Sequence, residues 1–158
     1  MSAVVVLAAG NDARGDDALG PRLLDYVDAL ALPSVRTVFD FQFQIEHALE
    51  LDDAELALFI DAHAMQRVPL RLRRVVADVS PFTTSHALSP AQVLAVHGRV
   101  GRHACPPAFV LSVAGTCFEL GAGLSATAAI ALAAAQTQIA ALLADPRATA
   151  WARVVDQG

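Results

Sequence analysis

The stretch AVVVLAAGNDARGDDALGPRLLDYV, residues 3–27, contains a short apolar run, an acidic turn and an amphipathic segment. Residues 3–9 are continuously apolar and are followed by a glycine, which is typical of a strand buried on both faces. Leucine and valine then recur at helical spacing from Leu19 to Val27. A buried strand followed closely by a helix is the repeating unit of α/β proteins with a parallel sheet.

The same alternation continues along the chain. Ser89 and Gln92 match the capping box that begins a helix, with proline at the first helical position. Interleaved arginine and apolar residues after Leu70 indicate a strand with one solvated face. Strands are predicted over residues 35–39, 55–62, 70–79 and 108–113, and helices over residues 45–51, 90–100 and 125–143. We therefore predict a three-layer α/β fold, with a twisted, mostly parallel sheet of about five strands and helices on both faces.

Length and composition narrow the class of protein. The 158 residues suit one domain, which we place over 1–158 with a weakly patterned tail at 146–158. The net charge of −5 argues against a nucleic-acid partner and against a basic membrane-surface protein. All 11 basic residues are arginines, so lysine-based catalysis is excluded. Cys105 and Cys117 are too few for a disulfide scaffold and are not spaced for a zinc site.

One uncharged segment, residues 120–144, is long enough to span a bilayer. It is rich in alanine and contains glycine, threonine, serine and glutamine, which insert less favourably than leucine or isoleucine. We therefore predict a buried helix there and no membrane association. No targeting signal is evident at the N-terminus, so a cytoplasmic location is the default expectation.

Ligands of open α/β sheets bind beyond the carboxyl ends of the strands, so the loops after the strands are the places to look for chemistry. The loop after the first strand, residues 10–20, has no GxGxxG or GK[ST] motif and is acidic, which disfavours phosphate binding. Asp16 and Asp17 have two interpretations there. They either complement the dipole and cap the free N–H groups of the following helix, or form part of a cation site.

Further candidates follow later strands. Asp61 ends the apolar run ELALFI and is either a turn or capping residue or a functional carboxylate. His86 lies in a polar loop before a predicted helix, and His63, beside Asp61, is a lesser candidate. Two carboxylates and one imidazole form an O,O,N ligand set that suits zinc or nickel and leaves positions open for substrate. The remaining histidines are interpreted as surface or packing residues: His47, His97 and His103.

The last strand is followed by a glycine-rich loop over residues 115–125, with Ser125 as the expected N-cap of the next helix. Cys117 in this loop has no evident activating base, so a structural thiol is favoured over a nucleophile. Glu119 is interpreted either as an orienting group or as a solvated side chain.

Taken in order, four segments resemble the nickel–iron hydrogenase maturation endopeptidases: GN followed by GDDALG, then FIDAHA, SHALSPAQVL and FELGAGLS. The resemblance covers residues 4–143. It implies an α/β fold and three metal-contacting, catalytic residues, which map onto Asp17, Asp61 and His86. The family commonly has GxGN before the first loop, where this chain has AAGN at residues 8–11. The stretch DFQFQ, residues 40–44, falls where the family often has a glycine-rich segment near the cleft.

The resemblance also implies an activity. These endopeptidases remove the C-terminal extension of the NiFe-hydrogenase large-subunit precursor, using nickel already inserted in that precursor as a recognition handle. The nickel therefore belongs to the substrate, and little or no metal is expected on this protein alone. Either the metal polarises the scissile carbonyl or a carboxylate helps to deliver water.

Two other function classes compete with this interpretation. A non-catalytic, nickel-sensing accessory protein would dock the same precursor without cutting it. A nucleotide-binding module of the doubly wound type is disfavoured because the glycine fingerprint is missing and the first loop is acidic.

Overall fold

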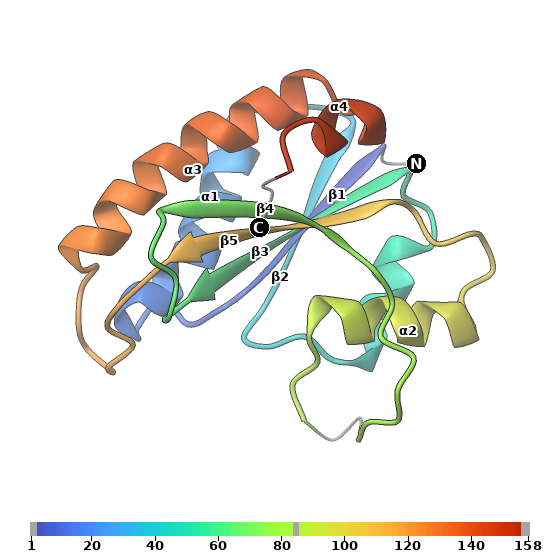
Figure 1. Ribbon diagram of the computed structural model, residues 1–158, viewed down its shortest axis with the longest axis horizontal. Helices are drawn as coiled ribbons and strands as arrows, with labels where there is room; N and C mark the ends of the chain where they lie inside the picture. The colour runs from blue at the N-terminus through green and yellow to red at the C-terminus, as the bar shows by residue number, and fades with distance from the viewer. Residues whose placement is uncertain (1–2, 84–85, 156–158) are drawn as a thin grey trace.

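The computed structural model describes residues 3–83 and 86–155, and it contains a five-stranded sheet between helices (Figure 1). The strands are β1 (Val4–Ala9), β2 (Val35–Asp40), β3 (Leu56–His63), β4 (Leu70–Val75) and β5 (Ala108–Ala114). Their order across the sheet is β2-β1-β3-β5-β4, and all neighbours are parallel except β4, which runs antiparallel to β5. The predicted mostly parallel α/β sheet of about five strands is confirmed.

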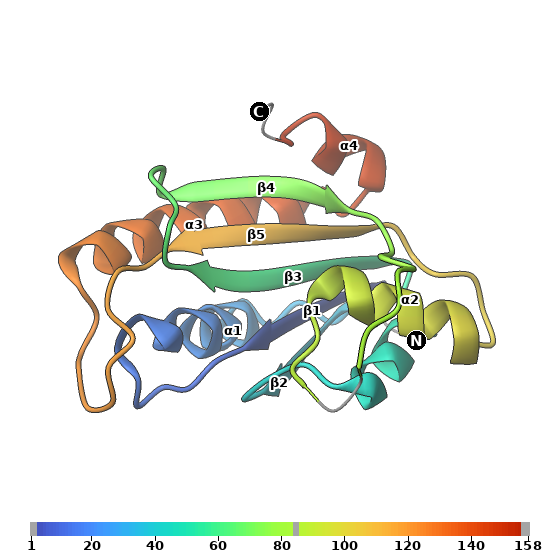
Figure 2. The same cartoon turned by 60° about the horizontal axis from the view of Figure 1, so that its bottom comes forward.

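Helices cover both faces of this sheet. The α-helices are α1 (Leu19–Ala29), α2 (Pro90–Val100), α3 (Ala126–Ala144) and α4 (Ala148–Ala152), and two 3₁₀ helices are η1 (Gly15–Ala18) and η2 (Ile45–Leu51). One apolar core contains side chains of α1 and α3, and a second core on the opposite face contains side chains of η2 and α2. Figure 2 shows α1 and α3 on one side of the sheet and α2 on the other.

The inner strand β1, between β2 and β3, is buried on both faces, as its uninterrupted apolar sequence predicts. Val4 and Val6 contribute to the core beneath α1 and α3, whereas Val5 and Leu7 contribute to the core beneath η2 and α2. This alternation follows from the two-residue period of a strand. Burial of both faces fixes the register of β1 in the sheet. The loop that begins after Ala9 therefore lies at the carboxyl edge.

Helix α3 is apolar and long enough to cross a membrane by length and composition. In the structure it packs along the sheet through one face, on which buried residues recur at helical spacing. The buried residues on this face include Ala128, Ala131, Ala135, Ile139 and Leu142.

Two features differ from the sequence-based expectations. Strand β4 ends at Val75, earlier than the predicted 79. The tail forms the short helix α4, whose Trp151 is buried against Phe109 with ring centroids 5.4 Å apart. The indole nitrogen of Trp151 donates to the backbone oxygen of Leu142 at 2.8 Å, so α4 closes the end of the core beneath α3. Five residues are too few for a recognisable helical period.

Candidate functional site

A cleft of about 290 Å³ lies at the carboxyl edge of the sheet and contains two of the three predicted site residues. Asp17 comes from the loop after β1, and Asp61 comes from the end of β3. The rest of the lining comes from the ends of β1, β2 and β3 and from the segment before α2: Ala9, Gly10, Phe41, Gln42, Phe43, Ile60, Ala87, Leu88, Ser89 and Pro90. The DFQFQ segment therefore borders the cleft, as the sequence resemblance implied.

The turn after β1 positions Asp17. The carboxylate oxygen Oδ2 of Asp17 accepts a hydrogen bond from the backbone N–H of Asn11 at 2.8 Å. Gly10 packs directly against the backbone carbonyl of Asp17, and a Cβ atom at position 10 would overlap that oxygen. The glycine and the asparagine therefore hold this loop in the conformation that presents Asp17 to the cleft.

Asp61 has an electrostatic environment suited to proton transfer. Asp61 is exposed at the rim of the cleft, but desolvation of its carboxyl by the surrounding residues raises its pKa above the usual value, and the negative charge of Asp17 acts in the same direction. The nearby His63 opposes both effects. A carboxyl group with a raised pKa at the end of a strand can accept or donate a proton closer to neutral pH than an ordinary aspartate.

His86 lies beside the cleft, one residue before its lining begins at Ala87, and its side chain is exposed. Within residues 3–83 and 86–155, no three His, Cys, Asp or Glu side chains are grouped so that they could hold a metal ion. The structure thus brings Asp17 and Asp61 together and leaves His86 outside the lining. The convergence of all three side chains on one metal ion stays a prediction.

Asp16 has a role that the sequence did not reveal. It is fully buried, and its carboxylate accepts hydrogen bonds from the backbone N–H groups of Thr116, Cys117 and Ser125 at 2.6, 3.1 and 2.8 Å. The Ser125 hydroxyl donates a fourth bond at 2.7 Å. Burial acts to raise the pKa of Asp16, but these bonds together outweigh it, so the pKa lies below its usual value.

Of the two interpretations of Asp16 and Asp17, helix capping is not observed: among the described residues, neither side chain bonds the N–H groups at the start of η1 or α1, although both carboxylates lie in the first turn of η1. Asp16 instead ties the first loop to the glycine-rich loop after β5, about a hundred residues away. In that loop Ser125 is the N-cap of α3, as predicted, and accepts from the N–H of Ala128 at 3.1 Å. Asp16 therefore holds in place the loop that carries its neighbour Asp17.

The side chains of Cys117 and Glu119 do not line the cleft. Cys117 is partly buried and takes part in the link to Asp16 through its backbone, because its carbonyl accepts from the N–H of Asp16 at 2.7 Å. Glu119 is exposed. Both observations favour the structural interpretation of this loop.

Three histidines outside the cleft serve local structure. The Nδ1 atom of His47 accepts from the backbone N–H of Gln44 at 2.8 Å, which begins η2. The Asp52 carboxylate contacts the ring nitrogens of His97 and His103 at 3.0 and 3.1 Å. Hydrogen bonds from the backbone and side chain of His103 and from His97 hold the pKa of Asp52 well below its usual range.

Several solved structures of similar shape are hydrogenase maturation proteases. The hydrogenase maturating endopeptidase HybD from E. coli matches with a TM-score of 0.65 and 22% identity, over 90% of this chain and 92% of that chain. The hydrogenase 2 maturation peptidase from a Thaumarchaeota archaeon matches with a TM-score of 0.61 and 22% identity, over 89% and 97%. The [NiFe] hydrogenase maturation protease HycI from Thermococcus kodakarensis matches with a TM-score of 0.65 and 16% identity, over 91% and 94%.

These matches show that the chain has the fold of the hydrogenase maturation proteases along nearly its whole length. The fold that the sequence resemblance implied is thereby confirmed. No protein-family model matches the sequence, and no curated protein matches it significantly. Because one fold can carry several activities, the activity has to be argued from the cleft.

Proposed function

We propose that this chain is an endopeptidase that removes the C-terminal extension of a nickel-loaded NiFe-hydrogenase large-subunit precursor. The observation that carries the proposal is the pair of carboxylates, Asp17 and Asp61, lining one cleft at the carboxyl edge of the sheet. The similarity in fold to HybD and HycI, described as a maturating endopeptidase and a maturation protease, supports the reaction class.

In the proposed reaction the nickel ion is part of the substrate. Asp17 and Asp61 would offer it two oxygen ligands, and His86 would offer one imidazole nitrogen, a donor set compatible with nickel. Such a set leaves positions open, so the metal would remain held mainly by the precursor. The proposal requires the His86 imidazole to reach the cleft when the precursor binds, because its side chain is exposed beside the cleft in the free protein.

The peptide bond would then be cut by water. Nickel bound to the substrate can polarise the scissile carbonyl, and a carboxylate can take the proton of the attacking water. Asp61 suits the second role because its raised pKa favours proton uptake in a partly buried cleft. Asp17, whose carboxylate is held by the N–H of Asn11, would contact the nickel of the precursor and so orient the precursor in the cleft.

A non-catalytic accessory protein that senses nickel in the same precursor is the alternative. It would need the cleft only as a docking site, so substitution of Asp61 would weaken docking without affecting any bond cleavage. Detection of a shortened precursor separates the two functions.

The test is to incubate purified, nickel-loaded precursor with the wild-type protein and to follow the intact mass of the precursor. We expect loss of the C-terminal extension with wild type and no loss with Asp61→Asn. Glu119→Gln is a matched control, because it removes one exposed carboxylate in the glycine-rich loop and outside the cleft. Cleavage by Asp61→Asn at the wild-type rate would refute the proposed role of the cleft.

A further inference from the structure

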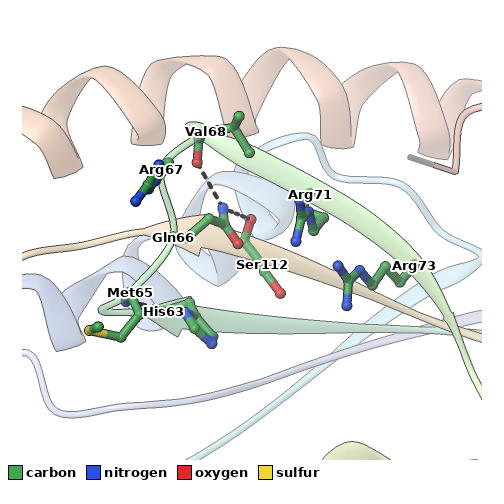
Figure 3. Close-up of a pocket in the computed structure, with 8 residues that line it drawn as sticks. All are labelled: His63, Met65, Gln66, Arg67, Val68, Arg71, Arg73 and Ser112. Atoms are coloured by element: carbon green, nitrogen blue, oxygen red, sulfur yellow. Dashed lines mark hydrogen bonds between the residues drawn. The ribbon is translucent and has the colours of Figure 1, made fainter. Parts of the chain in front are cut away.

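A second hollow, of about 330 Å³, lies on the sheet beside the cleft, and three arginines are among the residues that line it (Figure 3). We call it the arginine groove and define it by His63, Arg67, Arg71, Arg73 and Ser112. These residues come from the end of β3, the β3–β4 turn, β4 and β5. None of them has a part in the proposed cleavage.

Strand register places the groove on the same face of the sheet as the cleft. Asp61 pairs with Ser112 across β3 and β5, and Ser112 pairs with Arg71 across β5 and β4. Residues paired in this way point to the same face, and His63 shares that face because it is two residues from Asp61. With neighbouring strands about 4.8 Å apart, the backbone of Arg71 lies about 10 Å from that of Asp61.

The β3–β4 turn that carries Arg67 is held against the sheet. The side-chain amide of Gln66 donates to the backbone oxygen of Val68 at 2.9 Å and to that of Ser112 at 3.0 Å, and both bonds are drawn in Figure 3. The turn residues are therefore fixed relative to β5. A groove with a fixed wall loses little conformational entropy when a ligand binds.

Two arginines of the groove, Arg67 and Arg71, have no ion-pair partner within the described part of the chain. By contrast, Arg36 pairs with Glu50 and Arg147 pairs with Asp145. On a protein of net charge −5, the guanidinium groups of Arg67 and Arg71 are therefore available to bind an external anion.

We infer that the arginine groove binds an acidic segment of the polypeptide substrate, an inference that rests on the proposed endopeptidase function. The planar guanidinium group matches a carboxylate with two parallel hydrogen bonds. An extended chain advances about 3.3 Å per residue and would need about three residues to cover the roughly 10 Å between Asp61 and Arg71. The acidic residue of the substrate would therefore lie about three residues along the chain from the residue bound at Asp61. The groove would orient the substrate chain across the cleft and set its position for cleavage.

Peptide binding tests the groove without precursor or nickel. Wild-type protein is titrated at low salt into fluorescein-labelled hexaglutamate, hexaglutamine and hexalysine peptides, and fluorescence polarisation is recorded. We expect binding of hexaglutamate alone, weakened by added salt. The Arg67→Gln/Arg71→Gln variant should bind about tenfold more weakly, as expected for two partly exposed charge pairs.

The matched control is Arg99→Gln/Arg102→Gln, which removes the same charge from exposed positions on and after α2. It should change the affinity less than twofold. If the groove double variant melts early, the single variants Arg67→Gln and Arg71→Gln replace it, each with an expected loss of about threefold. Equal losses in groove and control variants, no hexaglutamate binding, or tighter binding of a labelled single-stranded RNA decamer would overturn the inference.

Precursor cleavage supplies an independent readout. For the groove variant we expect a higher KM with an unchanged kcat, because the groove binds substrate away from the reacting bond. A wild-type protein that binds hexaglutamate but never cuts the precursor contradicts the proposed function alone. A groove variant that cuts the precursor with the wild-type KM contradicts the inference alone.

Discussion

Replacing Asp16 with alanine removes the acceptor of four hydrogen bonds that join the first loop to the loop after β5. The bonds come from Thr116, Cys117 and Ser125, and the carboxylate itself is fully buried. Asp17, the next residue, is half-buried and accepts one such bond among the described residues, from the backbone of Asn11. Adjacent aspartates thus have separate roles, Asp16 in stability and Asp17 in the cleft.

The expected loss of stability follows from the donors left behind. A buried donor without an acceptor costs about 1–3 kcal/mol, and hydrogen bonds to a charged group are at the stronger end. Water can replace part of the lost bonding because Thr116 is exposed, so we expect Asp16→Ala to lower the free energy of unfolding by about 4 kcal/mol. For a domain of this size that corresponds to a melting temperature lower by about 10 °C.

Thermal unfolding followed by circular dichroism, with urea unfolding as a second measure, tests this difference. Asp17→Ala is the control, and we expect it to cost about 1 kcal/mol or less while abolishing precursor cleavage. Asp16→Ala with a melting temperature within about 2 °C of wild type would refute the structural role of Asp16. An equal loss of stability in both variants would refute the division of roles between them.

Three further predictions concern the cleft and its surroundings. Because the folded-state pKa of Asp61 is raised, its contribution to the free energy of unfolding falls as pH rises above about 4. At pH 7 we therefore expect Asp61→Asn to leave the free energy of unfolding, measured in urea, unchanged or higher by less than about 1 kcal/mol. Because the folded-state pKa of Asp52 is lowered, its contribution to the free energy of unfolding is present above its unfolded pKa of about 3.9 and is lost as pH falls further. Asp52→Asn should therefore make the free energy of unfolding depend less steeply on pH in the acid range. Gly10→Ala should cost about 2 kcal/mol and slow precursor cleavage, because the added Cβ forces the Asp17 backbone to move; wild-type kinetics in this variant would contradict the close approach.

Much of the fold could be predicted because its signals are local. The apolar run of β1 requires burial on both faces, and the Ser89 capping box specifies where α2 begins within a few residues. Asp61 could be placed at the ligand edge because it ends the apolar run of a strand in a parallel sheet.

The features that were missed depend on contacts between distant segments. The four bonds of Asp16 join residues about a hundred positions apart, and no local pattern distinguishes this acceptor from an ordinary helix cap. Helix α4 exists because Trp151 packs on Phe109, a tertiary contact that overrides a weak local pattern.

The candidate site was predictable in part for the same reason. Asp17 follows β1, and Asp61 lies near the carboxyl end of the adjacent parallel strand β3, so the sheet topology brings them to one edge. His86 follows no such rule, because it lies in a loop whose path the sheet does not determine. Its approach to the two carboxylates therefore remains a prediction for the complex with precursor.

Nickel dependence of cleavage is the most direct test of the central claim. Precursor is prepared in three forms: nickel-loaded, nickel-free, and nickel-free with added zinc. Each form is incubated with the protein, and the intact mass of the precursor is then measured by mass spectrometry. The proposed function predicts loss of the C-terminal extension from the nickel-loaded precursor only, because only that form carries a nickel ion that Asp17, Asp61 and His86 can contact. Cleavage of nickel-free precursor at the same rate, or restoration by zinc, would contradict it.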